Sequence, residues 1–178
     1  YFSPSDQALK HVSDYVRGSA DHNVYFLIFA FSDQTLTDVL KVKWEGSKLA
    51  GQGQRTGFEI RGVFDPLFWN QWWSASVDMT GRRGKRESEE NPNIYWAIRP
   101  PVFPAREDRK LHMKTMLVDA GTDSDPAVIT GSMNWSRNGG EVNDENTLII
   151  YNARIVNLFE QEFWARYWQA GGWLRPVD

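Results

Sequence analysis

The chain has 178 residues, a formal net charge of −3 and no cysteine. This length suits one domain with a substantial core, and the lack of cysteine excludes disulfides, thiolate nucleophiles and cysteine-ligated metal sites. The net charge argues against a surface that is basic all over, and no apolar run approaches the roughly 20 residues of a membrane-spanning helix. The first residue is Tyr1, which indicates a piece processed or excised from a longer protein. The composition leaves the cellular compartment open.

The first half of the chain alternates predicted helices and strands. Ser3 is the expected N-cap of a helix with Pro4 at its first position, and apolar residues at helical spacing extend that helix to about Gly18. The run VYFLIFAF (24–31) is apolar throughout, which predicts a strand that is buried on both faces. The elements expected next are a helix around residues 36–40, a flexible loop at 51–57 and a strand at 58–65.

The second half is expected to hold most of the strands. An insertion is expected at about 66–110, and its residues 66–92 have weak periodicity and are predicted to be solvated, aromatic in LFWNQWW (67–73) and charged in TGRRGKRESEEN (80–91). Residues 153–172 have apolar side chains at helical spacing and end on two glycines, which predicts a C-terminal helix. The other expected elements are strands at 93–98, 111–119, 126–132 and 146–152 and a loop at 100–106. Together these elements predict one α/β domain, residues 1–178, with a mixed, largely parallel sheet flanked by helices.

The predicted strand LHMKTMLVD (111–119) carries polar side chains that are unusual in a buried strand. Because strand side chains alternate, His112 and Lys114 project from the same face, whereas Asp119 projects from the other. An imidazole and an ammonium are therefore held side by side, which favours an anion-binding site. The alternative is a strand whose edge simply faces water, since lysine is seldom buried without a partner. Asp119 is expected to have a structural, hydrogen-bonding role.

The stretch TGSMNWSRNGGEVNDEN (130–146) supplies further polar groups after the next predicted strand. Gly131 permits a tight turn, and Ser132 and Asn134 are two residues apart, so both point to one side as long as the chain is extended. Glu145 then leads into the following strand. The sequence thus predicts a histidine, a lysine, a serine, an asparagine and a glutamate on three consecutive strands.

The spacing of these residues resembles the HKD signature of the phospholipase D superfamily. The matching motifs are HxKx4D at 112–119, GSxN at 131–134 and NDEN at 143–146. The FSP of residues 2–4, the strand YFLIFAF and the helix expected after GSMNWS also resemble the compact bacterial nucleases of that superfamily, and the likeness covers most of the chain. Two features depart from the family pattern: the segment GTDSDPA (121–127), which lengthens the spacing between the two halves of the motif, and the Trp-rich insertion.

The resemblance implies a phospholipase D-like domain with one HKD motif that hydrolyses a phosphodiester without a metal or other cofactor. His112 is expected to attack phosphorus and to form a covalent phosphohistidine, which water later hydrolyses. Lys114 and Asn134 are expected to stabilise the anionic non-bridging oxygens, with Ser132 as a further hydrogen-bond donor. Glu145 suits a carboxylate that orients a catalytic imidazole, and its alternative is a surface glutamate at a strand edge.

In-line displacement places the attacking and leaving groups on opposite sides of phosphorus, so one histidine cannot serve both in the same step. His11 lies in the first predicted helix and His22 precedes a strand with no neighbouring lysine, so both are expected to be ordinary surface or cap residues. The second histidine is therefore expected from another copy of the motif. That copy is either an identical subunit related by a two-fold axis, in a homodimer, or a second HKD domain of the longer chain.

The surroundings of the motif predict the substrate. Basic residues that are expected to follow a nucleic-acid backbone are Arg82, Arg83, Lys85, Arg86, Arg99, Arg106, Arg109 and Lys110. Tryptophans that are candidates for stacking on bases are Trp69, Trp72, Trp73 and Trp96. The alternatives are a solvated basic loop tip, balanced by Glu87, Glu89 and Glu90, and tryptophans that pack in the core or in an interface.

These patterns favour a metal-independent phosphodiesterase, an endonuclease that acts on nucleic acid. One alternative is a phospholipase D-type lipid phosphodiesterase whose LFWNQWW segment enters a membrane interface. Another is a catalytically incomplete half of a protein with two HKD motifs, which serves alone only in folding or dimerisation. The sequence leaves open DNA against RNA, the strand preference and the compartment.

Overall fold

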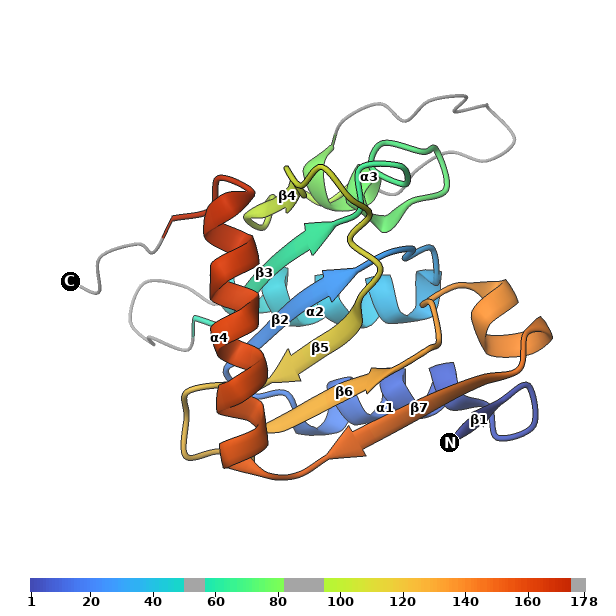
Figure 1. Cartoon of the computed structure of the whole chain (residues 1–178). Helices are drawn as coiled ribbons and strands as arrows, with labels where there is room; N and C mark the ends of the chain where they lie inside the picture. Colours follow the sequence, from blue (N-terminus) through green and yellow to red (C-terminus); the bar gives the residue numbers. More distant parts are fainter. Residues whose placement is uncertain (50–56, 82–94, 174–178) are drawn as a thin grey trace.

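The computed structural model describes residues 1–49, 57–81 and 95–173. Within these residues a seven-stranded sheet forms the centre of the molecule, in the order β1-β7-β6-β5-β2-β3-β4. Helices α1 and α2 cover one face of the sheet, and α4 crosses the other (Figure 1). The strands are β1 (Phe2–Ser3), β2 (Asn23–Ile28), β3 (Glu59–Phe64), β4 (Val102–Pro104), β5 (Lys114–Val118), β6 (Ala127–Gly131) and β7 (Glu145–Ile150). The helices are α1 (Ala8–Ser19), α2 (Gln34–Leu49), α3 (Ala75–Thr80) and α4 (Ala153–Gln169), with a π-helical turn, η1 (Asn138–Val142).

The sheet is mixed and flanked by helices, as predicted, but fewer of its neighbouring strands pair parallel than antiparallel. β2 pairs parallel with β3, and β3 with β4, through crossovers that contain α2 and α3. β5 then pairs antiparallel with both β2 and β6, β6 with β7, and β7 with β1. The expectation of a largely parallel sheet is therefore wrong for the described strands. The physical reason is that the chain turns back after β5 and again after β6, and strands joined in this way are antiparallel neighbours.

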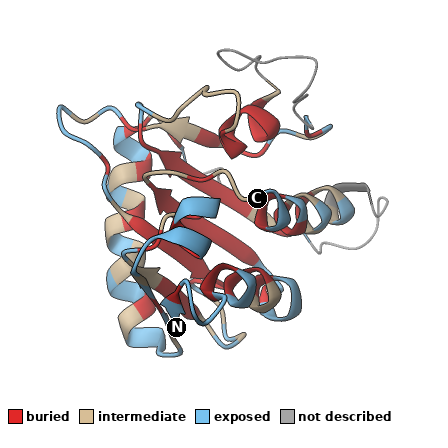
Figure 2. Ribbon diagram, turned by 90° about the vertical axis from the view of Figure 1, so that its right-hand side faces the viewer, coloured by how far each residue is buried: buried red, intermediate tan, exposed pale blue. Residues whose placement is uncertain are grey.

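The central strands β2, β3 and β5 are buried on both faces, which explains their apolar sequences. All six residues of β2 are buried, with Phe26 and Ile28 on the side of α1 and α2, and Tyr25 and Leu27 on the side of α4. Figure 2 shows buried strands between helices whose outer sides are exposed. Full burial of one such side chain contributes about 1.5–3 kcal/mol, so the central strands are a stable frame for groups at their ends. None of the helices in the described ranges is long and apolar enough to cross a membrane.

Most predicted elements are confirmed, with shifted ends. The strands expected at 24–31, 58–65, 126–132 and 146–152 are β2, β3, β6 and β7, and the helices expected around 36–40 and at 153–172 are α2 and α4. The strand predicted at 111–119 begins only at Lys114, so His112 precedes β5 instead of lying within it.

The N-terminal helix begins later than predicted. Ser3 lies in β1, which pairs with β7, so it is not an N-cap, and Pro4 lies before α1 instead of in its first turn. The main chain of Tyr1 exchanges two hydrogen bonds of 2.9 Å each with Thr147. Several backbone hydrogen bonds at a sheet edge thus outweigh the single bond that a capping side chain provides.

The predicted insertion is in large part integral to the domain. Residues 66–81 contain α3, whose buried side chains join the core, so the expectation of a solvated segment is wrong there. The strand predicted at 93–98 is absent from residues 95–98, the part that the structure describes. The loop predicted at 100–106 contains β4, an edge strand in which a proline is tolerated. The loop predicted at 51–57, except Gly57, and the basic cluster at 82–86 lie outside the described residues.

Candidate active site

One edge of the sheet gathers the polar residues that the sequence singled out. The C-terminal ends of β2, β3 and β6 and the N-terminal ends of β5 and β7 meet there, as the opposed pairs Ile28 with Lys114 and Gly131 with Thr147 show. β5, β6 and β7 are neighbours in the sheet. Their ends and the adjoining residues carry, in this order, His112 and Lys114, Ser132 and Asn134, and Glu145.

His112 and Lys114 are in contact at this edge. The Lys114 Nζ atom lies 3.2 Å from Nδ1 and 3.1 Å from Nε2 of His112, and it donates a hydrogen bond to the His112 carbonyl oxygen at 3.0 Å. His112 is exposed to solvent, and the Phe29 ring lies 4.6 Å from the imidazole between centroids. An exposed imidazole beside an ammonium is placed to meet an anionic substrate.

Lys114 holds its ammonium in a largely dry position. The residue is 6% exposed, and Nζ lies 4.9 Å from the centre of the Phe29 ring. Burial lowers the pKa of Lys114, and the carboxylates of Glu145 and Asp65 act in the opposite direction. A cation that is shielded from water interacts strongly with an approaching anion. The two carboxylates thus help to sustain positive charge where a phosphate oxygen would need it.

Asp65 connects the backbone segments around the site, and no sequence motif had singled it out. The residue is fully buried, and its carboxylate accepts hydrogen bonds from the backbone N–H groups of Leu67 (2.9 Å) and Leu111 (2.8 Å). Leu111 immediately precedes His112, so this bond fixes the approach to the imidazole. The sequence does offer one signal for Asp65, which is an acidic residue at the end of the predicted strand FEIRGVFD. A carboxylate that is buried at the end of a strand requires hydrogen-bond partners.

The chain makes close contacts where β6 ends. Gly131 has φ 146°, and a Cβ atom there would lie 2.2 Å from the Asn146 carbonyl oxygen, so only glycine fits. Ser132 is exposed, and its hydroxyl oxygen accepts a hydrogen bond from the Asn146 backbone N–H at 3.0 Å.

Asn134 Oδ1 is buried and has no hydrogen-bond partner within the described residues. An unpaired buried acceptor costs about 1–3 kcal/mol, a cost that proteins tolerate chiefly at functional sites.

Glu145 reaches the same edge from β7. Its Oε1 atom accepts a hydrogen bond from Asn143 Nδ2 at 3.1 Å. β7 lies two strands from β5, which is about 10 Å between backbones. Among the described contacts, Glu145 has no hydrogen bond to His112, and its role as the group that orients a histidine stays a prediction.

Asp119 lies at the opposite edge of the sheet from His112. Its buried carboxylate accepts hydrogen bonds of 2.7–3.1 Å from the backbone N–H groups of Asp21, His22 and Asn23. The carboxylate thereby joins the end of β5 to the start of β2. These contacts are of the structural kind expected for this residue.

The predicted substrate-binding residues have several locations. Arg109 and Lys110 are exposed and immediately precede Leu111. Arg82, Arg83, Lys85 and Arg86 lie outside the described residues. Arg99 lies beside Gly81 after α3, and Arg106 beside Gly171 after α4. Among the tryptophans, Trp96 is 3% exposed and packs in the core, whereas Trp69, Trp72 and Trp73 are half-buried.

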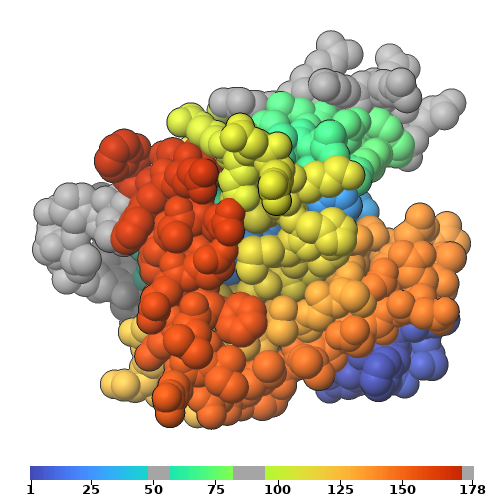
Figure 3. Space-filling model, in the orientation of Figure 1, coloured from blue at the N-terminus to red at the C-terminus, as the bar shows by residue number. Residues whose placement is uncertain are grey.

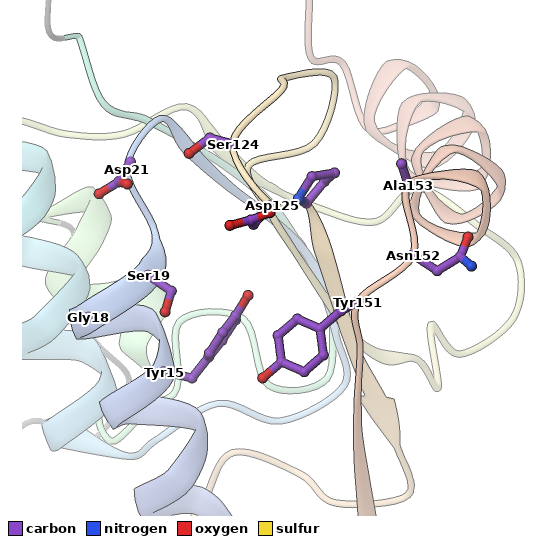
Figure 4. Close-up of a pocket in the computed structure, with 10 residues that line it drawn as sticks. Tyr15, Gly18, Ser19, Asp21, Ser124, Asp125, Tyr151, Asn152 and Ala153 are labelled. Atoms are coloured by element: carbon purple, nitrogen blue, oxygen red, sulfur yellow. The ribbon is translucent and has the colours of Figure 1, made fainter.

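A pocket of about 820 Å³ lies at the opposite edge of the sheet from His112 (Figure 4). Tyr15 and Tyr151 approach each other there, with ring centroids 5.5 Å apart, and residues 124–126 form part of the wall. Among the described residues its lining includes two carboxylates and no lysine, arginine or histidine, so it is unsuited to phosphate. The longer spacing within the HKD-like motif, at 121–127, therefore lies away from the candidate site. Within the described ranges, no group of three or more His, Cys, Asp or Glu side chains is arranged to hold a metal ion.

Comparison with known proteins agrees with this architecture. Residues 18–168 match the family model described as "Cardiolipin synthase, PLD-like domain", and no curated protein matches the sequence. Among solved structures, Nuc from Salmonella typhimurium, a phospholipase D family member, is similar over 94% of this chain and 91% of its own, with 18% identity and a TM-score of 0.67. For NucT from Helicobacter pylori the shares are 97% and 96%, the identity is 16% and the TM-score is 0.68.

A larger protein contains a similar unit. Polyphosphate kinase from Porphyromonas gingivalis is 14% identical, with a TM-score of 0.54, and the likeness covers 100% of this chain and 26% of that one. At these identities the structural likeness shows a shared fold, while the family match spans most of the chain. The chain is a PLD-like domain and belongs to the phospholipase D superfamily.

Proposed function

We propose that the protein is a phosphodiesterase that cleaves nucleic-acid chains internally, with His112 as its nucleophile. The observation that carries this proposal is the contact between the exposed His112 imidazole and the buried ammonium of Lys114, 3.1 Å from Nε2. Hydrolysis of a phosphodiester requires a nucleophile and a nearby cation, because anionic oxygens shield the phosphorus from attack. His112 and Lys114 place these two groups side by side. Membership of the phospholipase D superfamily supports the same class of reaction.

In the first step, an imidazole nitrogen of His112 attacks phosphorus, the bond to the leaving oxygen breaks, and a second histidine donates the proton that this oxygen takes up. In the second step, that histidine removes a proton from water, the resulting hydroxide attacks phosphorus, and the P–N bond breaks to release His112. Lys114, Asn134 and Ser132 bind the non-bridging oxygens in both steps. Glu145 orients a catalytic imidazole through its carboxylate. This scheme requires no metal ion.

The second histidine comes from a second copy of the chain in this proposal. His11 is exposed and stacks on Tyr1 at 4.2 Å, and Tyr1 adjoins β1, three strands or about 14 Å from β5. His22 lies at the opposite edge, where its backbone N–H bonds to Asp119. Since the sequence has three histidines, His112 of an identical subunit, related by a two-fold axis, is the group that completes the site. A second motif in a longer chain is the alternative source.

Nucleic acid is the proposed substrate because exposed cations precede the site. Arg109 and Lys110 come directly before Leu111 and His112, where they meet a phosphate next to the one that is cleaved. A lipid diester is the alternative. The observation that favours it is Leu67, which is 54% exposed and has the apolar character of a residue that enters a membrane interface.

The test compares cleavage of single-stranded DNA, plasmid DNA, RNA, a chromogenic phosphodiester and phosphatidylcholine vesicles in excess EDTA by wild type, His112→Ala and His22→Ala. We expect cleavage by the wild type and by His22→Ala, none by a folded His112→Ala, and a dimer by light scattering. Cleavage by folded His112→Ala at the wild-type rate would refute the mechanism. Turnover of phosphatidylcholine vesicles alone would identify a lipid enzyme, and an inert monomer would identify an incomplete half.

A further inference from the structure

A row of aromatic rings begins at the His112 imidazole and continues along residues 66–73. Between centroids, the Phe29 ring lies 4.6 Å from the imidazole, the Phe68 ring 4.7 Å from Phe29, and the Trp73 ring 5.4 Å from Phe68. Phe29, Phe68 and Trp73 are all half-buried. Each therefore keeps part of its surface in contact with solvent, beside an exposed imidazole.

Aromatic side chains that only fill the core of this protein are buried more deeply. Phe26, Phe31 and Trp135 pack against one another and are 0–1% exposed. Phe68 and Trp73, by contrast, belong to neither of the two core clusters of the described residues. Core packing therefore does not account for their positions.

The segment 66–73 is fixed relative to His112. The Asp65 carbonyl oxygen accepts a hydrogen bond from the backbone N–H of Phe68 at 3.2 Å, and the Asp65 carboxylate accepts one from Leu111 at 2.8 Å. One residue thus anchors both the aromatic segment and the approach to the imidazole. Figure 3 shows the green and yellow parts of the chain, to which these segments belong, packed side by side. A surface that is already ordered loses little conformational entropy when a ligand binds.

We propose that Phe68 and Trp73 form a stacking surface for the nucleobase next to the cleaved phosphodiester, so that the substrate is single-stranded nucleic acid; this rests on the proposed function. Two centroid distances, of 4.6 and 4.7 Å, lead from the imidazole through Phe29 to Phe68. This separation suits a nucleotide whose phosphate lies at His112 and whose base lies on Phe68. A base in a duplex is paired and stacked between its neighbours, whereas a base in a single strand offers its face to a protein ring.

The test measures how much Phe68 and Trp73 contribute to the recognition of a nucleoside. Thymidine 5′-(p-nitrophenyl phosphate) and thymidine 3′-(p-nitrophenyl phosphate) are each compared with methyl p-nitrophenyl phosphate, which has the same leaving group and no base. The quantity measured is the ratio of kcat/KM for the nucleoside diester to kcat/KM for the methyl diester. The variants are Phe68→Ala, Phe68→Leu and Trp73→Ala, with Leu67→Ala as the control, because that side chain lies in the same segment, is 54% exposed and is not part of the row.

Phe68→Ala and Trp73→Ala are expected to lower this ratio about 5- to 100-fold for at least one of the two nucleosides, which is the effect of losing the stacking of one base. Phe68→Leu keeps an apolar side chain without an aromatic face and is expected to lower the ratio nearly as much, whereas Leu67→Ala leaves it unchanged. The wild type is also expected to cleave a single-stranded oligonucleotide faster than the duplex of the same sequence.

Two kinds of failure are distinguishable. Ratios that stay at the wild-type value in the Phe68 and Trp73 variants, or equal rates on single strand and duplex, would overturn this inference alone, because phosphodiester cleavage would persist. A wild type that cleaves none of the three chromogenic diesters and no oligonucleotide would overturn the proposed function and this inference with it.

Discussion

Asp65→Asn is expected to destabilise the fold, because asparagine cannot replace both acceptors of this buried carboxylate. The two oxygens of Asp65 accept separate backbone N–H groups, from Leu67 at 2.9 Å and from Leu111 at 2.8 Å. Asparagine has one acceptor oxygen and an NH2 group, which would face the other N–H as a second donor. The loss of one charge-assisted hydrogen bond costs about 1.5–3 kcal/mol. In a domain of this size the melting temperature should fall by about 3–12 °C.

The same substitution is expected to lower kcat for a chromogenic diester about 100-fold, because Leu111 no longer fixes the neighbouring His112 and a misplacement of about 1 Å has an effect of that size. Thermal unfolding by circular dichroism and steady-state kinetics on the folded variant measure the two effects. Asp33→Asn is the control: Asp33 accepts the Leu36 N–H at 2.7 Å at the start of α2, and asparagine is an equally good N-cap. If Asp65→Asn melts and turns over like this control, the Asp65 carboxylate is not the anchor that its contacts indicate.

Three further predictions concern charge and space. Glu145→Gln removes a carboxylate that opposes the lowering of the Lys114 pKa. Because the proposed phosphate-binding form of Lys114 is the protonated one, the alkaline limb of kcat/KM should move to lower pH. An unmoved limb would exclude this electrostatic role. Gly139→Ala should reduce kcat about tenfold or more, because the Cβ atom of the alanine would lie 2.2 Å from the Asn134 carbonyl oxygen and displace Asn134. Steady-state kinetics measure this effect, and wild-type turnover would show that Asn134 tolerates the displacement. Asp119→Asn should lower the melting temperature by about 3–12 °C. It should leave kcat of the folded protein within about twofold of the wild-type value, since the contacts of Asp119 lie at the opposite edge of the sheet from His112. A large loss of kcat would show that Asp119 takes part in the reaction.

The proximity of His112 and Lys114 was predictable because it depends on the backbone alone. Two residues that are separated by one other project to the same side of an extended chain, and this holds although β5 begins only at Lys114. The polar residues after β6 and at the start of β7 reach the same edge because the chain reverses direction after each strand. Local spacing therefore suffices to predict that His112 and Lys114 are in contact, and strand order suffices to predict that the other polar residues share their edge of the sheet.

Contacts between distant segments had no local signal. Asp65 and Leu111 are 46 residues apart, and no spacing rule connects them. The expected N-cap at Ser3 failed for a related reason, since β7, near the other end of the chain, offers the N-terminal backbone more hydrogen bonds than a helix start does. Residues 66–73 have neither strand nor helix periodicity, because contacts with Phe29 and Asp65 determine their positions.

A mixed dimer shows whether one reaction needs two copies of His112. Wild-type and His112→Ala chains with different affinity tags are coexpressed, and dimers that carry both tags are purified and assayed on a chromogenic diester in excess EDTA. The expected result is an inactive mixed dimer, with less than about 1% of wild-type turnover, because the remaining histidine, once bound to phosphorus, has no second histidine to take the proton from the attacking water. Turnover at about half of the wild-type value would contradict the shared site, since each chain would then hold a complete set of catalytic groups.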